Sequence, residues 1–362
     1  MLKSKTLVLG LEHFIDKIGY QSIVYKKNGI SVRYLVLDKS GYTKEKVNKY
    51  DADVIIVPKN LILRILITIW NMIVFRPQDV EIYDIGRTTF IYILLAKIFN
   101  IKSIIILRGR ELECNQGIRK FGLIKSLELC NHIIAKEYNI IENLKKININ
   151  TNKLSFIYNS VPIPSSDKLY NFKDREIDII YINSIRKSRN VHILIDVFYE
   201  LMKELPNLNI FLVGFTSFDK NNYSMEPKYE KYVLDLIKKR DLEDKIKLKG
   251  FVSDPTKYQK NSKIFVFPSN KVFLNYSLLE SMSYGVIPIV GDGEGADKII
   301  KNDYNGYISK INKNDFKKTL LKVLKNDNNY NNKISMRAYY TVQNKYSIKQ
   351  WGDKMINIKE NI

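Results

Sequence analysis

Basic residues lie close together in one stretch of the second half of the chain, at Arg186, Lys187 and Arg189. The stretch follows the apolar run 178–182, which is typical of a buried strand. Fixed cations at such a place stabilise the negative charge that develops on a departing diphosphate. A loop whose charges are only solvated would show the same pattern, so both interpretations remain open at this point.

A second candidate site is the helix expected between Ser277 and Gly285. Ser277 and Glu280 have the spacing of a capping box, which predicts a helix that begins at Ser277. Gly285 is predicted to end it in the left-handed conformation. A helix N-terminus that follows a buried strand, here 265–267, offers free N–H groups to an anion such as a diphosphate. The other interpretation is that Ser277 and Glu280 only cap the helix and have no role in binding.

The first half offers one comparable place, Arg108, Gly109 and Arg110, directly after the apolar run 103–107. An arginine here would contact a phosphate or an anionic acceptor, or would be a plain surface charge. The two cysteines and three histidines of the chain are too scattered for a disulfide framework or a metal site, and they are typical of a reducing cytoplasm.

Short apolar runs alternate with helical patterns along the whole chain, which predicts an α/β fold with doubly wound parallel sheets. The strands are expected at 6–11, 32–37, 53–57, 80–85, 103–107, 132–135, 154–158, 178–182, 209–213, 246–248, 263–267 and 286–290. The helices include 90–99, 138–146, 192–205, 228–240, 278–284 and 315–324.

A break at residues 166–176 predicts a linker between two Rossmann-like domains, 1–165 and 177–344, that face a central cleft. A last helix at about 345–362 is expected to pack back on the first domain. Ligands of such sheets bind beyond the carboxyl ends of the strands, so the candidate residues above are expected at the cleft.

The segment from Pro268 and Ser269 through 278–288 resembles the donor-binding segment of the retaining GT-B glycosyltransferases of the large group 1 family. The resemblance implies that Glu280 hydrogen-bonds the ribose hydroxyls of a nucleotide sugar. The family has a second glutamate, which contacts the donor sugar, eight positions earlier, where this chain has Val272. Asn275, Tyr276 or loop amides are the substitutes expected here.

The stretch 178–190 resembles the family's strand and loop that carry a phosphate-binding arginine and lysine, five positions apart. Arg189 takes the lysine position and Ser184 the arginine position, so Arg186 and Lys187 are expected to supply the missing cation. Gly214 resembles the glycine beside the nucleotide. Further weak matches are the loop with Gly250 and Phe251 near the nucleobase, the Asn-Ser-Val at 159–161 that ends the first domain, and Arg108, where the family often has a histidine that contacts the donor.

The resemblance implies transfer of a sugar, with retention, from a nucleotide sugar (a UDP-sugar) to an acceptor held by the first domain. The leaving diphosphate is thought to take the acceptor proton in such enzymes, and they usually need no metal. The nucleotide sugar is a substrate, and no cofactor is expected. The residues expected at the donor are Gly214, Gly250, Phe251, Asn275, Tyr276, Ser277, Leu278 and Glu280, and the catalytic ones are Arg186, Lys187, Arg189 and Glu280.

The chain carries 59 Lys and Arg against 38 Asp and Glu, a net charge of +21. This excess fits nucleic acid, an anionic membrane surface or phosphate-bearing substrates, and the composition of an AT-rich genome would also produce it. Nucleic acid is not expected as a partner, because no nucleic-acid-binding motif is present. The apolar stretch 61–75 is too short to span a bilayer, so it is either a buried domain helix or a helix in the membrane interface.

A basic chain with no signal peptide suits lipid-linked acceptors on the inner face of the cytoplasmic membrane, where it is expected to be cytoplasmic or peripheral. Synthesis of bacterial surface polysaccharide, such as lipopolysaccharide or capsule, is the expected setting. The other hypothesis is a degenerate, non-catalytic homologue that acts as a binding or scaffold subunit, because Ser184 and Val272 replace two functional residues.

Overall fold

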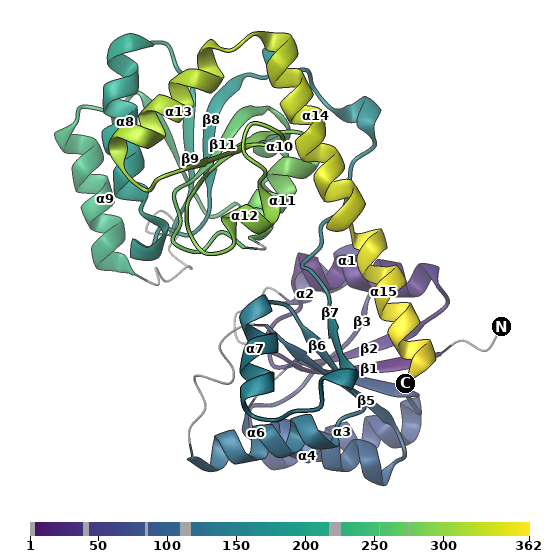
Figure 1. Ribbon diagram of the computed structural model, residues 1–362. Helices are drawn as coiled ribbons and strands as arrows, with labels where there is room; N and C mark the ends of the chain where they lie inside the picture. The colour runs from purple at the N-terminus through teal and green to yellow at the C-terminus, as the bar shows by residue number, and fades with distance from the viewer. Residues whose placement is uncertain are drawn as a thin grey trace. The chain divides into compact units, whose positions relative to one another are not determined.

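The structure is a computed structural model that describes residues 4–38, 43–83, 86–108, 117–216, 226–252, 254–273 and 275–362. The chain folds into two compact units (Figure 1). Unit 1 consists of Met1–Ser160 together with Ile348–Ile362, and unit 2 is Val161–Ser347.

Unit 1 is built on a parallel sheet whose strands follow the order β3-β2-β1-β4-β5-β6-β7. The central strands are runs of Val, Ile and Leu that are buried almost throughout, as expected where helices cover both faces of a sheet. The strands are β1 (Lys5–Leu11), β2 (Ser31–Val36), β3 (Asp53–Ile56), β4 (Asp79–Ile82), β5 (Lys102–Leu107), β6 (His132–Ala135) and β7 (Leu154–Phe156).

Helices cover the two faces of this sheet with separate apolar cores. Side chains of α3, α4, α6 and α7 form one core, and those of α1, α2 and α15 form the other. The helices themselves can be followed in Figure 1. The helices are α1 (Asp16–Lys27), α2 (Thr43–Tyr50), α3 (Leu61–Phe75), α4 (Arg87–Ile98), α6 (Gly117–Leu129), α7 (Tyr138–Lys146) and α15 (Ile348–Asn361), with a 3-10 turn η1 at Thr151–Lys153.

Unit 2 repeats the same winding, with a parallel sheet in the order β10-β9-β8-β11-β12-β13. Its strands are β8 (Ile177–Ile182), β9 (Ile210–Phe215), β10 (Ile246–Gly250), β11 (Ser262–Phe267), β12 (Ile287–Gly291) and β13 (Tyr307–Ser309).

In unit 2, α8 packs against α9 and α13, while α14 packs against α11. The helices are α8 (Val191–Glu204), α9 (Pro227–Lys239), α10 (Thr256–Lys260), α11 (Tyr276–Ser283), α12 (Ala296–Ile299), α13 (Lys313–Lys325) and α14 (Asn328–Lys345), with 3-10 turns η2 (Ser166–Lys168), η3 (Phe172–Asp174) and η4 (Lys187–Arg189).

The predicted fold class, two Rossmann-like parallel-sheet units, is confirmed. The stretch 166–176, expected to be a linker, instead belongs to unit 2, because the Arg175 side chain is buried there. Its guanidinium donates to the carbonyl oxygens of Ser262 and Tyr284 at 2.8 and 2.9 Å, which ties the stretch to β11 and to the end of α11. The short strand β13 and the helix α14 were not predicted.

Candidate functional site

The carboxyl ends of β8, β9 and β11 lie side by side in unit 2, because β8 is paired with both of the other two strands. The loop that follows β8 carries Arg186, Lys187 and Arg189, and the loop that follows β11 leads into α11. The topology therefore places the basic stretch and the start of α11 at one edge of the sheet, as the sequence predicted.

Asn183, directly after β8, connects these parts. Its side-chain amide donates to Oδ1 of Asn275 at 3.3 Å, and the same oxygen accepts the backbone N–H of Leu278 at 3.2 Å. The backbone of Gly214 in β9 lies very close to Asn183, since a Cβ at Gly214 would lie 2.1 Å from the carbonyl oxygen of Asn183. Its φ of +120° is also a conformation that glycine alone adopts without strain.

The helix α11 begins earlier than the predicted capping box would place it. Asn275 is the N-cap, so Ser277 lies within the first turn and the capping role assigned to Ser277 and Glu280 is wrong. Asn275 is preferred because Asn183 also bonds it, which holds its oxygen over the N–H of Leu278. The first turn, with Tyr276 and Ser277, directs its N–H groups out of the helix end, an arrangement that can bind an anion. Gly285 follows α11 with a φ of +68°, as predicted.

Arg189 is half-buried and held between the two loops. Its Nη1 donates to Oγ of Ser269 at 2.6 Å and to the carbonyl oxygen of Lys271 at 2.9 Å. The guanidinium carbon lies 5.0 Å from the centroid of the Phe267 ring. Nε of Arg189 is buried and finds no hydrogen-bond partner among the residues that the structure describes. The guanidinium is therefore fixed in orientation and still has donor capacity for a ligand.

Arg186 adds a second positive charge next to the first. Burial lowers the pKa of Arg189, and the charge of Arg186 acts in the same direction. Arg186 is half-buried, whereas the side chain of Lys187 is exposed and its backbone N–H donates to the Glu226 carboxylate at 2.8 Å. The two positive charges repel each other, and an anion bound beside both would relieve that repulsion.

Glu280 lies one turn into α11 and is half-buried. Its Oε2 accepts a hydrogen bond from the side-chain amide of Gln259 at 3.3 Å, and Gln259 is itself buried in α10. The amide orients the carboxylate, which can accept further hydrogen bonds from a ligand's hydroxyl groups. Gly250 ends β10, and the exposed Phe251 follows it. Leu278 is a buried core residue, so only its backbone is available to a ligand.

Val272, at the position where a donor-contacting glutamate was expected, is fully buried. Its backbone N–H donates to the carbonyl oxygen of Glu294 at 3.0 Å. The backbone N–H of Glu294 in turn donates to the carbonyl oxygen of Asn270 at 2.8 Å. This pairing fixes the loop before α11 with the Val272 side chain in the core. The side chain is thus part of the packing and offers a ligand no polar group.

Three positioning residues of this site were not singled out from the sequence: Asn183, Ser269 as the partner of Arg189, and Gln259. For the first two a signal was present, because each is a polar residue one or two positions after a buried strand. For Gln259 there was none, since its role depends on α10 packing against α11.

In unit 1, Arg108 directly follows β5 and is exposed. It donates to the carbonyl oxygen of Tyr83, which follows β4, at 3.3 Å. Lys136, directly after β6, is buried, and Lys17 lies in the first turn of α1. Burial lowers the pKa of Lys136 to about 7, and the charge of Lys17 adds to this effect. Gly109 and Arg110 lie outside the described residues.

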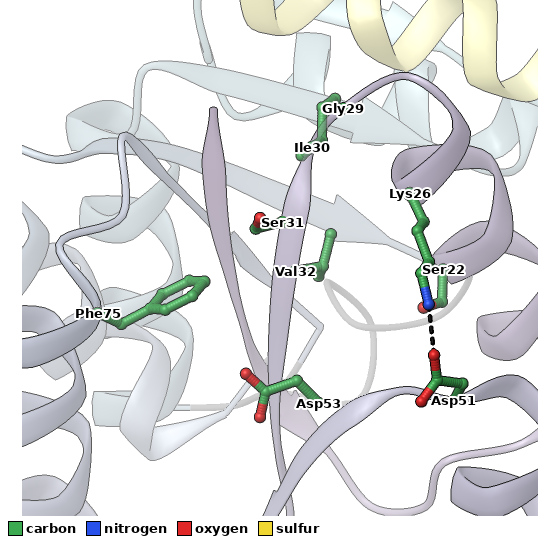
Figure 2. Close-up of a pocket in the computed structure, with 9 residues that line it drawn as sticks. All are labelled: Ser22, Lys26, Gly29, Ile30, Ser31, Val32, Asp51, Asp53 and Phe75. Carbon is green, nitrogen blue, oxygen red and sulfur yellow. Dashed lines mark hydrogen bonds and ion pairs between the residues drawn. The ribbon is translucent and has the colours of Figure 1, made fainter. Parts of the chain in front are cut away.

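A hollow of about 400 Å³ in unit 1 lies away from these strand ends (Figure 2). It is bounded by Gly29–Val32 at the start of β2, by Asp51 and Asp53, and by Phe75. Its charges are paired within the chain, because Asp51 binds Lys26 and Asp53 binds Arg33 at 2.8 Å. We therefore assign it no role in ligand binding.

Comparison with known proteins adds to this geometry. Residues 163–340 match the family model of the glycosyl transferases group 1. The capsular polysaccharide biosynthesis glycosyltransferase CapH of Staphylococcus aureus is 32% identical over 148 residues, which are 41% of this chain and 39% of CapH. The matched region thus spans about two fifths of that relative's length.

Solved structures extend the similarity over both units. A glycosyltransferase from Rickettsia africae superposes with a TM-score of 0.76 at 16% identity, over 100% of this chain and 99% of that one. Anabaena HepE, solved in complex with UDP-glucose, gives a TM-score of 0.78 at 12% identity, over 99% and 100% of the two chains. Such identities establish a shared fold, which is the GT-B fold. The family match identifies the segment 163–340, almost all of unit 2, as a member of the group 1 glycosyl transferases, and the solved structures show that both units together have the fold of such enzymes.

Proposed function

We propose that the chain is a glycosyltransferase that transfers a sugar, with retention, from a UDP-sugar to a glycan or lipid-linked acceptor. The observation that carries the proposal is the arrangement at the carboxyl edge of the unit 2 sheet. There Arg189, the start of α11 and Glu280 lie within the segment that matches the family model.

Each of these groups has a distinct role in the proposal. The first turn of α11 and the guanidinium groups of Arg186 and Arg189 bind the diphosphate, with the exposed Lys187 beside them. Glu280, oriented by Gln259, accepts hydrogen bonds from the ribose hydroxyls. The cations stabilise the charge that grows on the diphosphate as the bond to the sugar breaks, which is when they lower the barrier.

Retention follows from attack on the face from which the diphosphate leaves. The acceptor oxygen forms its bond to the anomeric carbon there, and the departing diphosphate oxygen takes the proton of the acceptor hydroxyl. In this proposal the guanidinium groups and the helix N-terminus stabilise the charge on the diphosphate, so the transfer needs no metal ion.

The names of the relatives support the choice of donor and setting. HepE was solved with UDP-glucose, and CapH is a glycosyltransferase of capsular polysaccharide biosynthesis. We therefore place the reaction in the synthesis of bacterial surface polysaccharide, capsule or lipopolysaccharide, at the inner face of the cytoplasmic membrane.

A second candidate is a non-catalytic homologue that binds a nucleotide without turnover. The observation that favours it is the pair of departures at Val272, which is buried, and at Ser184, where the family's arginine is missing.

The test is a thermal-shift and donor-hydrolysis screen with UDP-, GDP- and ADP-sugars, on the full chain and on Glu280→Gln. We expect UDP-sugars to bind, and the variant to bind them about tenfold more weakly or worse, because it loses charge-assisted hydrogen bonds. Glu243→Gln, at an exposed position before β10, is the matched control and should bind as the parent does. Equal UDP affinity in all three would disprove the site, while binding without turnover would support the second candidate.

A further inference from the structure

The helix α3 exposes an apolar side to solvent. Its polar residues Thr68 and Asn71 are buried together with Met72 and Phe75, whereas most of its large apolar side chains are exposed. Six of them are between 49% and 70% exposed: Ile62, Leu63, Leu66, Trp70, Ile73 and Val74. A surface helix of a water-soluble protein has the opposite pattern. Scattered exposed apolar residues need no explanation, but a continuous stripe marks an interaction surface.

The buried polar residues of α3 are satisfied within the unit. The hydroxyl of Thr68 donates to the carbonyl oxygen of Arg64 at 2.9 Å, and the Asn71 amide donates to that of Ile67 at 2.8 Å. Oδ1 of Asn71 accepts from Arg33 at 3.2 Å. The first two bonds lie within α3, so the side of the helix that faces the sheet is fixed by the bond from Arg33 of β2 and by the burial of Met72 and Phe75. The exposure of the stripe is therefore built into the fold.

Two further helices extend the surface. The helices α3, α4 and α6 cover the same face of the unit 1 sheet (Figure 1), and Ile98 of α4 and Phe121 of α6 are 75% and 63% exposed. These three helices contain six basic residues and a single acidic one, Glu128. Exposed Lys59 and Arg76 flank α3 at its two ends.

We propose that this face, defined by the outward side chains of α3 with Ile98 and Phe121, docks on an anionic lipid bilayer. A basic rim around an apolar stripe matches the headgroup and acyl layers of such a surface. Trp70 would lie at the level of the headgroups. Contact with a second copy fits less well, because a symmetric contact brings like charges together.

The helix lies in the interface and does not cross it. Its 15 residues extend about 22 Å at 1.5 Å per residue, short of the roughly 30 Å of a hydrocarbon core. Within the described residues, no helix has the length and apolar character needed to span a bilayer. Docking itself is independent of the sugar transfer. Only its purpose, bringing unit 1 to a lipid-linked acceptor, rests on the proposed function.

Tryptophan fluorescence tests the docking directly, because the chain has two tryptophans and only Trp70 is exposed, Trp351 being buried. We expect the emission of the full chain to shift to the blue with vesicles of phosphatidylcholine and phosphatidylglycerol, and less with phosphatidylcholine alone. Added salt should reduce the shift. Trp70→Phe should show no shift. A spectrum that vesicles leave unchanged, or that both vesicle types shift equally, would overturn the proposal.

Flotation with the same vesicles provides the matched comparison. Leu66→Ser removes an outward side chain of α3 and should weaken partitioning at least about tenfold. Ile23→Ser changes an exposed residue of α1, which packs on the opposite face of the sheet from α3. This variant should float as the parent does. If Leu66→Ser instead converts a dimer to a monomer and leaves flotation unchanged, the face is a contact between copies. Hydrolysis of soluble UDP-sugars should be the same in the parent and in all these variants. If the parent binds vesicles but hydrolyses no UDP-sugar, the result counts against the proposed function and leaves the docking proposal intact.

Discussion

At the scale of single residues, Lys359 compensates the charge of two buried carboxylates on β4. The ammonium group binds Asp79, and it lies 2.9 Å from Oε1 of Glu81, all three side chains being almost fully buried. Burial alone would lower the pKa of Lys359, but the two carboxylates outweigh it and raise this pKa. Tyr25 of α1 also donates to Glu81, so α1, α15 and β4 meet at one charged cluster.

We expect Lys359→Met to destabilise unit 1 by about 3–5 kcal/mol, because it leaves two buried carboxylates without their cation. Urea unfolding of the full chain, followed by circular dichroism, measures the change. Lys349→Met replaces an exposed lysine of the same helix and should stay within about 0.5 kcal/mol of the parent. Equal losses in both variants would show that the helix, not the charge cluster, is responsible.

Lys136 makes stability depend on pH. Its pKa in the folded chain is about 7, against 10.5 for the ordinary side chain. Between these values the unfolded chain holds a proton that the folded chain has lost, so the contribution of this group to stability rises with pH over this window. Its slope is at most about 1.4 kcal/mol per pH unit.

Lys136→Met should therefore be more stable than the parent at pH 6, and the difference should shrink as the pH rises to 9. Urea midpoints measured at each pH unit for both chains would reveal the trend. Curves that run parallel across this range would mean that Lys136 keeps its proton in the folded chain.

At the scale of elements, the close approach of β9 to the end of β8 constrains the candidate site. A side chain at Gly214 would collide with the Asn183 carbonyl, and Asn183 in turn holds Asn275 at the start of α11. A change in β9 is thus transmitted to the helix end that we propose for the diphosphate.

Gly214→Ala should destabilise unit 2 by at least about 2 kcal/mol and weaken UDP binding, both from the collision and from the positive φ. Gly122→Ala is the control, because Gly122 lies inside α6 with nothing near its Cβ direction. It should raise stability by about 0.5–1 kcal/mol. Calorimetry and UDP titration measure both effects. A Gly214→Ala chain with unchanged UDP affinity would separate β9 from the site.

Element boundaries show where local sequence stops being informative. Ser277 and Asn275 are both good N-caps, and only a tertiary partner, Asn183, decides between them. Residues 61–75 were predicted as a helix with the observed ends, yet composition does not reveal which side faces the sheet. That depended on Arg33 of β2, which hydrogen-bonds Asn71 from another element.

At the scale of the whole molecule, the fold was predictable because both sheets consist of short Val- and Ile-rich runs separated by helices. These runs are buried on both faces, and each predicted strand is present to within a few residues. The strand β13 was missed because it has three residues and only Tyr307 and Ser309 are buried. The basic residues of the site were predictable from their place after β8, whereas Gln259 required the packing of α10.

The return of the chain to unit 1 has a consequence for biosynthesis. All of unit 2 is synthesised before α15, whose Trp351 and Met355 complete the core beside Ile18 and Tyr25. A nascent chain can therefore finish folding unit 2 while the part of this core that α15 covers is still open to water. Unit 1 can complete this core only after α15 has left the ribosome, so the N-terminal half of this protein is expected to be the last part to mature.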